Sequence, residues 1–170
     1  MNLIKYFTYQ YRFLIYATLA LLFALLTANL VHRFDLAAIA QLFSVFLVLA
    51  YIMRINNDIY HYKSNRHSHK KRFISKNGLF LLLAILSIVY LALNIIFYKH
   101  LGVFAVLLLG IVYIWELFPF GKIIFLPLAN LFYFYFYGGK EVFQHYEVWL
   151  SIIILLLTSI GVYCYKRGKK

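Results

Sequence analysis

The feature that most constrains the fold is a series of long apolar runs, separated by short polar turns and by one longer polar stretch. A helix needs about 20 predominantly apolar residues to cross the hydrocarbon core of a bilayer, and most of these runs approach that length. Their lack of strict polar–apolar alternation favours helices over a lipid-facing barrel. Because 65% of the 170 residues are hydrophobic and 13% are charged, one water-soluble core could not bury so much apolar surface.

We therefore predict an all-α integral membrane protein, a bundle of about six transmembrane helices that forms a single domain over residues 1–170. Residues 1–12 form an aromatic lead-in that we expect to lie along the membrane interface. The fifth span is the shortest, and Pro127 lies inside it. The expected spans cover residues 13–31, 36–53, 79–98, 101–117, 123–137 and 148–165.

The distribution of basic residues predicts the orientation of these spans. Fourteen of the 17 Lys and Arg residues fall on the side that carries both termini and the polar stretch 54–78, and three fall on the other side. The positive-inside rule then places both termini and the polar stretch in the cytoplasm (N-in/C-in), and we expect a multi-pass protein of the cytoplasmic (inner) membrane of a bacterium. The net charge of +12 suits anionic lipid or a phosphorylated ligand better than nucleic acid, because the basic residues lie between apolar runs.

The polar stretch holds seven of the 17 Lys and Arg residues and the best candidates for a site. If the second span continues as a helix, Asn57, His61 and Asn65 share one face because they are spaced four residues apart. Asp58 lies beside that row, and Arg54 lies one turn before Asp58. Polar residues at the end of a membrane helix commonly face the bundle interior and mark a site. The alternative is that they mark the point where the helix leaves the bilayer.

The other polar groups give weaker signals. The three histidines of the polar stretch match no zinc or iron spacing, and we expect them to be solvated. The run Lys70, Lys71 and Arg72 is suited to anionic lipid headgroups as much as to a diphosphate. Cys164 stands alone, so the sequence predicts neither a disulfide nor a cysteine metal motif.

At the end of the second span, the chain resembles the UbiA superfamily of intramembrane prenyltransferases. The first motif of that family ends the second membrane helix, reads broadly N/D-D/E-x-x-D-x-x-x-D, and precedes a basic loop. Asn57 and Asp58 match its first two positions, and Arg54 stands where a subgroup of the family has an arginine shortly before the motif. Loop residues similar to those of the family follow at Arg72-Phe73-Ile74 and Lys76-Asn77-Gly78-Leu79.

The resemblance implies a UbiA-like fold and recognition of an isoprenyl diphosphate. In the family, acidic residues hold Mg²⁺, which bridges the diphosphate of the donor, while Lys and Arg neutralise the leaving group. Here His61 and Asn65 stand where the family has Asp, so Asp58 is the one carboxylate of the motif and the candidate Mg²⁺ ligand. The second Asp-rich motif of the family is missing from this shorter chain. By resemblance, the substrate-binding candidates are Arg54, Asn57, Asp58, His61, Asn65, Lys71, Arg72 and Lys76.

The sequence leaves three functions open. The first is a prenyltransferase-like membrane protein that recognises an isoprenyl diphosphate, with its catalysis retained or lost and its catalytic residues unassigned. The second is a descendant of that family that has lost catalysis and serves as a lipid-binding or partner subunit. For the partners, the expectation is a homo-oligomer or, if the enzyme is split, a separate subunit that supplies the second half of the family fold. The third is a small six-span transporter, which the scarcity of ionisable residues within the spans disfavours.

Overall fold

The computed structural model describes residues 3–8, 12–30, 35–62, 74–98, 102–114 and 143–167, with positions 124, 127–128, 131 and 134–135 between them. All regular secondary structure in these residues is helical, so the prediction of an all-α fold is confirmed for the part that the structure describes. The principal helices are α1 (Leu3–Thr8), α2 (Arg12–Leu30), α3 (Leu36–Tyr60), α4 (Lys76–Phe97), α5 (Gly102–Ile114) and α7 (Tyr146–Arg167).

The observed helices follow the expected spans except at the polar stretch and at the fifth span. The helix α3 continues beyond the predicted end at residue 53 as far as Tyr60, and α4 begins at Lys76 instead of residue 79. The polar stretch is therefore helical at both of its ends. The predicted fifth span, 123–137, falls mostly outside the described residues.

Side-chain caps determine where two of the helices begin. Asp35 precedes α3 and accepts a hydrogen bond from the Ala38 amide at 2.6 Å. Ser75 precedes α4 and accepts one from the Gly78 amide at 3.2 Å. The first amides of a helix have no partner within the helix, and a side-chain oxygen at the preceding residue satisfies one of them. These caps explain why each helix starts at its observed residue.

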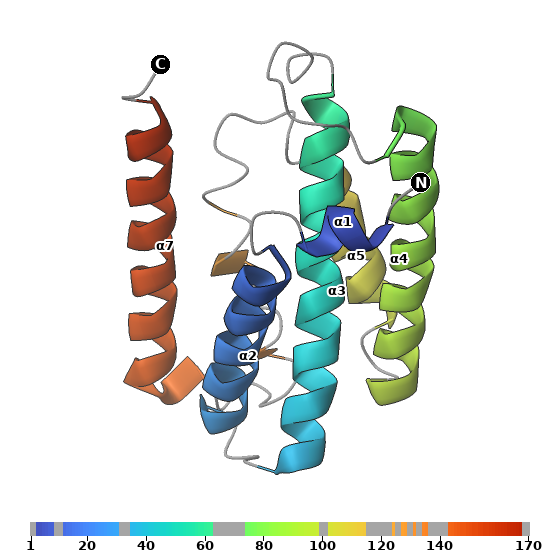
Figure 1. The fold of residues 1–170 in the computed structure, drawn as a ribbon. Helices are drawn as coiled ribbons and strands as arrows, with labels where there is room; N and C mark the ends of the chain where they lie inside the picture. The colour runs from blue at the N-terminus through green and yellow to red at the C-terminus, as the bar shows by residue number, and fades with distance from the viewer. Residues whose placement is uncertain are drawn as a thin grey trace.

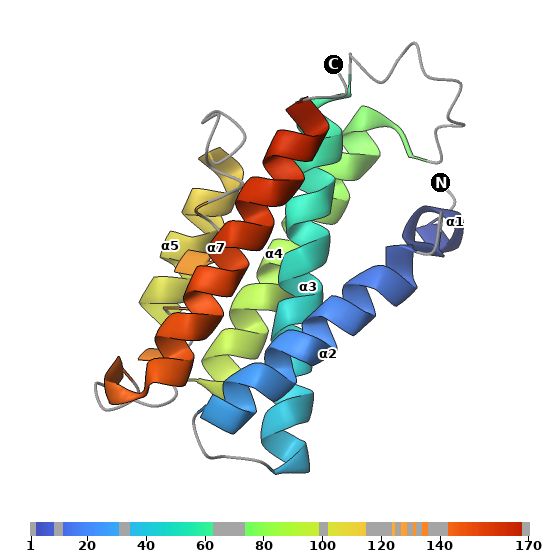
Figure 2. The ribbon, with the colours of Figure 1, turned by 90° about the vertical axis from the view of Figure 1, so that its left-hand side faces the viewer.

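The helix α3 is the one on which three of the other described helices pack. Figures 1 and 2 show that α2 and α4 run in the opposite direction to α3 and α7, whereas α1 lies across the bundle beside the start of α2. The helices α2, α4 and α5 all contact α3. The buried face of α3 follows helical spacing, which places it between these neighbours; its apolar members are Leu42, Val45, Phe46, Leu49, Tyr51, Ile52 and Ile55.

Small residues allow α2 to approach α3 closely. Ala20, Ala24 and Ala28 are spaced four residues apart on α2 and are all buried in the core shared with α3. Small side chains at this spacing let two helix backbones come together, as is common between membrane helices. The rings of Phe23 and Phe46 meet beside this contact, with their centroids 5.7 Å apart.

Two helices, α3 and α4, are long and apolar enough to cross a membrane, and α2, α5 and α7 contain shorter apolar stretches. Only 39% of the apolar window of α3 and 33% of that of α4 is buried within the protein. On α4, Leu81 and Ile88 are 59% and 67% exposed. Most of the apolar surface of these helices thus faces outward, where hydrocarbon would solvate it and water would not.

Hydrogen bonds between helices fix the position of α5. The Asn56 side chain on α3 donates to the Val112 carbonyl on α5 across 2.7 Å, and both residues are buried. Between α4 and α5, the hydroxyls of Ser87 and Tyr113 lie 2.6 Å apart. These contacts hold α5 beside the last turns of α3, where the candidate site lies.

Candidate functional site at the carboxyl end of α3

An ion pair lies on the last two turns of α3. Arg54 and Asp58 are four residues apart, so their side chains share one face of the helix. The Arg54 Nη2 atom lies 2.8 Å from the Asp58 Oδ1 atom, with the Arg54 side chain 30% exposed and the Asp58 side chain 13% exposed. The structure therefore brings together two of the predicted site residues, and Asp58 is largely withdrawn from solvent.

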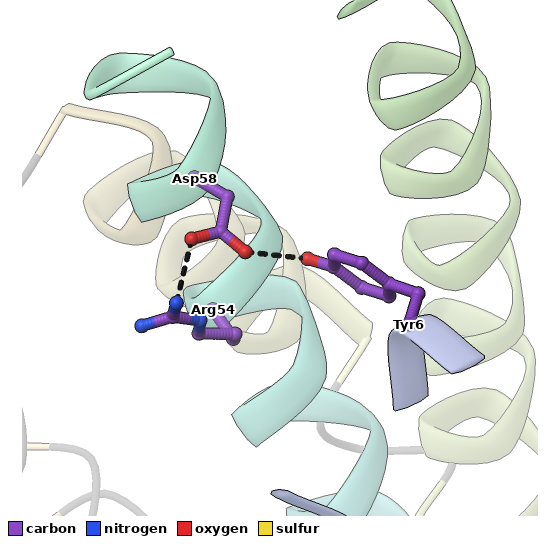
Figure 3. Close-up of polar contacts among 3 residues, drawn as sticks. All are labelled: Tyr6, Arg54 and Asp58. Atoms are coloured by element: carbon purple, nitrogen blue, oxygen red, sulfur yellow. Dashed lines mark hydrogen bonds and ion pairs between the residues drawn. The ribbon is translucent and has the colours of Figure 1, made fainter. Parts of the chain in front are cut away.

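Tyr6 reaches the same carboxylate from the other side. Its hydroxyl donates a hydrogen bond to the Asp58 Oδ2 atom across 2.8 Å, although the two residues are 52 positions apart in the chain. Figure 3 shows Arg54 and Tyr6 approaching Asp58 from different directions, one from α3 itself and the other from α1. Each carboxylate oxygen of Asp58 thus has a donor.

The position of Asp58 in the helix makes these partners necessary. Asp58 lies in the last turn of α3, where the free carbonyl groups carry the negative end of the helix dipole. A carboxylate is disfavoured there, and partial burial disfavours its charge further. The nearby guanidinium compensates both effects, and the Tyr6 hydroxyl adds a charge-assisted hydrogen bond.

Arg54 has an unused hydrogen-bonding group. Its Nε atom is buried and has no hydrogen-bond partner among the residues that the structure describes. Figure 3 shows its second terminal nitrogen directed away from Asp58. A buried donor without a partner costs about 1–3 kcal/mol, so an acceptor atom placed beside Arg54 would be favoured.

The other predicted site residues have different surroundings. Asn57 and His61 are half-buried, and the amide of His61, the residue that follows α3, donates to the Asn57 carbonyl across 3.0 Å. Lys76 is the first residue of α4, and its ammonium lies 5.7 Å from the centre of the Phe80 ring. The remaining candidates lie outside the described residues; they are Asn65, Lys71 and Arg72.

The described residues do not fit a Mg²⁺ centre at Asp58. Magnesium prefers an octahedron of oxygen ligands, commonly with one or two carboxylates. Each oxygen of Asp58 already has a donor, and the guanidinium at 2.8 Å would repel a divalent cation. Within the described ranges, no group of three His, Cys, Asp or Glu side chains is arranged to hold a metal ion.

Two residues of this region were not identified from the sequence. Tyr6 belongs to the aromatic lead-in, and nothing in the sequence links it to Asp58, because their contact depends on how α1 folds back over the bundle. Asn56 had a signal that could have been used, since it lies one helical turn after the buried Ile52 and so on the core face of α3.

Comparisons with known proteins do not add to this description: no family model, curated protein or solved structure matches the chain. The molecule is defined by its own features, an all-helical fold with two membrane-length apolar helices and a partly buried ion pair at the end of one of them. Its relation to the UbiA superfamily remains a prediction that rests on the residues of the polar stretch.

Proposed function

We propose that the chain is a multi-pass membrane protein that binds the diphosphate group of an isoprenyl lipid at the carboxyl end of α3, through cations and without metal-dependent prenyl transfer. The observation that supports the proposal is the arrangement of the Arg54 side chain. It is a guanidinium anchored by Asp58, with a buried Nε atom that has no partner in the described part of the chain.

The membrane assignment is supported by the outward-facing apolar surface of α3 and α4. The six-span bundle with both termini in the cytoplasm remains our proposal for the whole chain. It would place Arg54 and Asp58 near the cytoplasmic interface, where the headgroup of a lipid lies and where its acyl or prenyl chain can enter the hydrocarbon.

The chemistry of Arg54 matches a phosphate ligand. Guanidinium groups bind phosphate oxygens through charge-assisted hydrogen bonds, and these are stronger than bonds between neutral groups. Asp58 fixes the orientation of the guanidinium, which lowers the entropy lost when a ligand binds. The unused Nε atom would gain an acceptor on binding.

Further cations extend this site in our proposal. Lys71, Arg72 and Lys76 follow in the sequence, and several converging basic side chains can hold a diphosphate without a metal ion. Ionisation of a prenyl donor needs charge placed against the leaving group in the transition state. With Asp58 paired with Arg54 and hydrogen-bonded to Tyr6, we infer binding without efficient transfer.

The test is equilibrium binding of farnesyl diphosphate to the purified protein in nanodiscs of neutral lipid, with Mg²⁺ or with a chelator. We expect equal affinity under both conditions and no prenyl transfer. Arg54→Gln should weaken binding about ten-fold or more, because it removes charge-assisted hydrogen bonds. Arg167→Gln, which removes the same charge from the end of α7, is the matched control and should leave the affinity unchanged.

Two further arms separate the alternatives. The double variant His61→Asp with Asn65→Asp restores the carboxylates of the family motif and should make binding depend on Mg²⁺. Competition with vesicles of anionic phospholipid distinguishes a diphosphate site from general headgroup attraction. Prenyl transfer stimulated by Mg²⁺ in the unaltered protein would contradict the proposal, and so would displacement of the probe by anionic vesicles at a similar headgroup concentration.

A further inference from the structure

The short helix α1 covers Asp58, the acidic partner of the ion pair. Tyr6 is 5% exposed and Asp58 is largely buried beneath it, whereas Ile4 on the same helix is 77% exposed. One face of α1 therefore packs on the bundle, and another points outward. Figure 1 shows α1 lying across the bundle instead of along it.

Besides its packing on α2, two kinds of contact with α3 help to hold α1 in this place. The first is the hydrogen bond from Tyr6 to Asp58. The second is aromatic: the Phe7 ring meets the Tyr51 ring edge to face with centroids 4.8 Å apart, and Tyr16 packs on Tyr51 from α2 at 5.3 Å. Such ring pairs contribute roughly 0.5–1.5 kcal/mol beyond the area they bury. Contacts of these two kinds are individually modest, so one substitution can weaken each of them.

We infer that α1 is a lid that closes over Asp58, held in part by Tyr6 and Phe7, and that it must lift before a headgroup from the interface reaches the Asp58 side of the ion pair. The identity of the ligand rests on the proposed function, but the lid itself does not. Its outward face carries Ile4, which suits the apolar side of a membrane interface. A lipid that arrives within the interface would therefore meet α1 before it meets the ion pair.

The experiment measures how readily Asp58 reacts with a water-soluble carbodiimide and an amine, in the full chain in nanodiscs and without any ligand. Peptide mapping by mass spectrometry separates Asp58 from Glu147, an exposed carboxylate in the first turn of α7 that serves as the internal reference. In the unaltered protein, Asp58 should be labelled much more slowly than Glu147.

Weakening either the Tyr6–Asp58 hydrogen bond or the Phe7–Tyr51 ring contact should expose Asp58. Tyr6→Phe removes only the hydroxyl and should raise the labelling rate of Asp58 about ten-fold, as expected for loss of one hydrogen bond to a charged group. Phe7→Ala leaves that hydrogen bond in place and should still raise the rate about five-fold or more by weakening the aromatic contact. This second variant separates a lid from a purely local contact between Tyr6 and Asp58.

Matched controls come from the same kinds of contact elsewhere. Tyr113→Phe removes a hydroxyl bonded to Ser87, and Phe23→Ala removes a ring packed on Phe46. Neither should alter the labelling of Asp58. If Phe7→Ala behaves like Phe23→Ala, α1 is not a lid and the inference fails, whether or not farnesyl diphosphate binds. If both α1 variants raise labelling while no variant binds farnesyl diphosphate, the lid stands and the proposed function fails.

A final arm connects the lid with binding. If the lid must lift first, Tyr6→Phe and Phe7→Ala should raise the association rate of farnesyl diphosphate several-fold over their matched controls. Unchanged association rates in both α1 variants, with binding intact, would show that the ligand reaches Arg54 without passing α1, and would overturn the gating role.

Discussion

At the scale of single residues, the molecule shows two ways of burying a polar side chain in an apolar bundle. Asn56 is buried and donates to the Val112 carbonyl across 2.7 Å. Thr27 is fully buried on α2, but its hydroxyl has no partner among the described residues. A buried polar group stabilises the fold only if it is paired, because burial removes its hydrogen bonds to water. The two residues should therefore respond in opposite ways to substitution.

Asn56→Ala should lower the free energy of unfolding by about 1–2 kcal/mol, because it deletes the α3–α5 hydrogen bond and leaves a small void. Reversible unfolding in detergent micelles, followed by circular dichroism, measures the change. Asn29→Ala, at an exposed position of α2, is the matched control and should change stability little. Equal effects of the two substitutions would mean that the bond to Val112 contributes nothing to stability.

Thr27→Val should maintain the free energy of unfolding or raise it by up to about 1 kcal/mol, because it replaces an unpaired hydroxyl by a methyl group of similar size. The same unfolding assay applies. Thr158→Val is the comparison, since its exposed hydroxyl donates to the Ile154 carbonyl within α7. A loss of 1 kcal/mol or more in Thr27→Val would indicate that the Thr27 hydroxyl has a partner in the folded protein.

At the scale of helices, close packing of α2 on α3 depends on the row Ala20, Ala24 and Ala28. Ala24→Leu should destabilise the protein by about 1–3 kcal/mol, because the larger side chain cannot fit between the two backbones without a shift. Ala84→Leu, at an exposed position of α4, adds the same atoms where they meet lipid and should be nearly neutral. A neutral Ala24→Leu would show that the α2–α3 contact is looser than the structure describes.

The helix α3 also shows what the sequence could and could not predict. The apolar run predicts the helix itself, and the spacing of polar residues predicts that it continues on one face. The actual end at Tyr60 could not be predicted, because Asn56 and Asp58 obtain partners from α5 and α1. Those partners are distant in the chain, so the helix propensity of the local sequence cannot predict them.

At the scale of the whole molecule, the directions of the helices set the topology. The helices α2 and α4 run in the opposite direction to α3 and α7 (Figures 1 and 2), whereas the six-span orientation that the basic residues predict remains a proposal. The family resemblance also remains a prediction, because it rests on a few residues, of which Asn65 and the basic loop lie outside the described part. The residue types of the polar stretch suggest a class of ligand, but the geometry of the site depends on which side chains come into contact. The contact of Tyr6 with Asp58 could not be predicted from the sequence.

Single cysteines introduced into a Cys164→Ser background test the topology. With Ser68→Cys and Gln144→Cys, a membrane-impermeant thiol reagent should label the two positions from opposite sides of the membrane, Ser68 from the cytoplasm. Gln144 lies just before α7 and is exposed. Labelling of both positions from the same side would contradict the six-span arrangement.

The large sequence separation between Tyr6 and Asp58 has a consequence for biosynthesis. The helices α2, α3, α4 and α5 each pack on the helix that precedes them, so each pair can associate as soon as its second member leaves the ribosome. Tyr6 must wait until 52 further residues have been made and α3 has been inserted to its last turn. Closure of α1 on Asp58 thus follows completion of α3 by the nascent chain, and until then α1 can contact only α2 and the membrane surface.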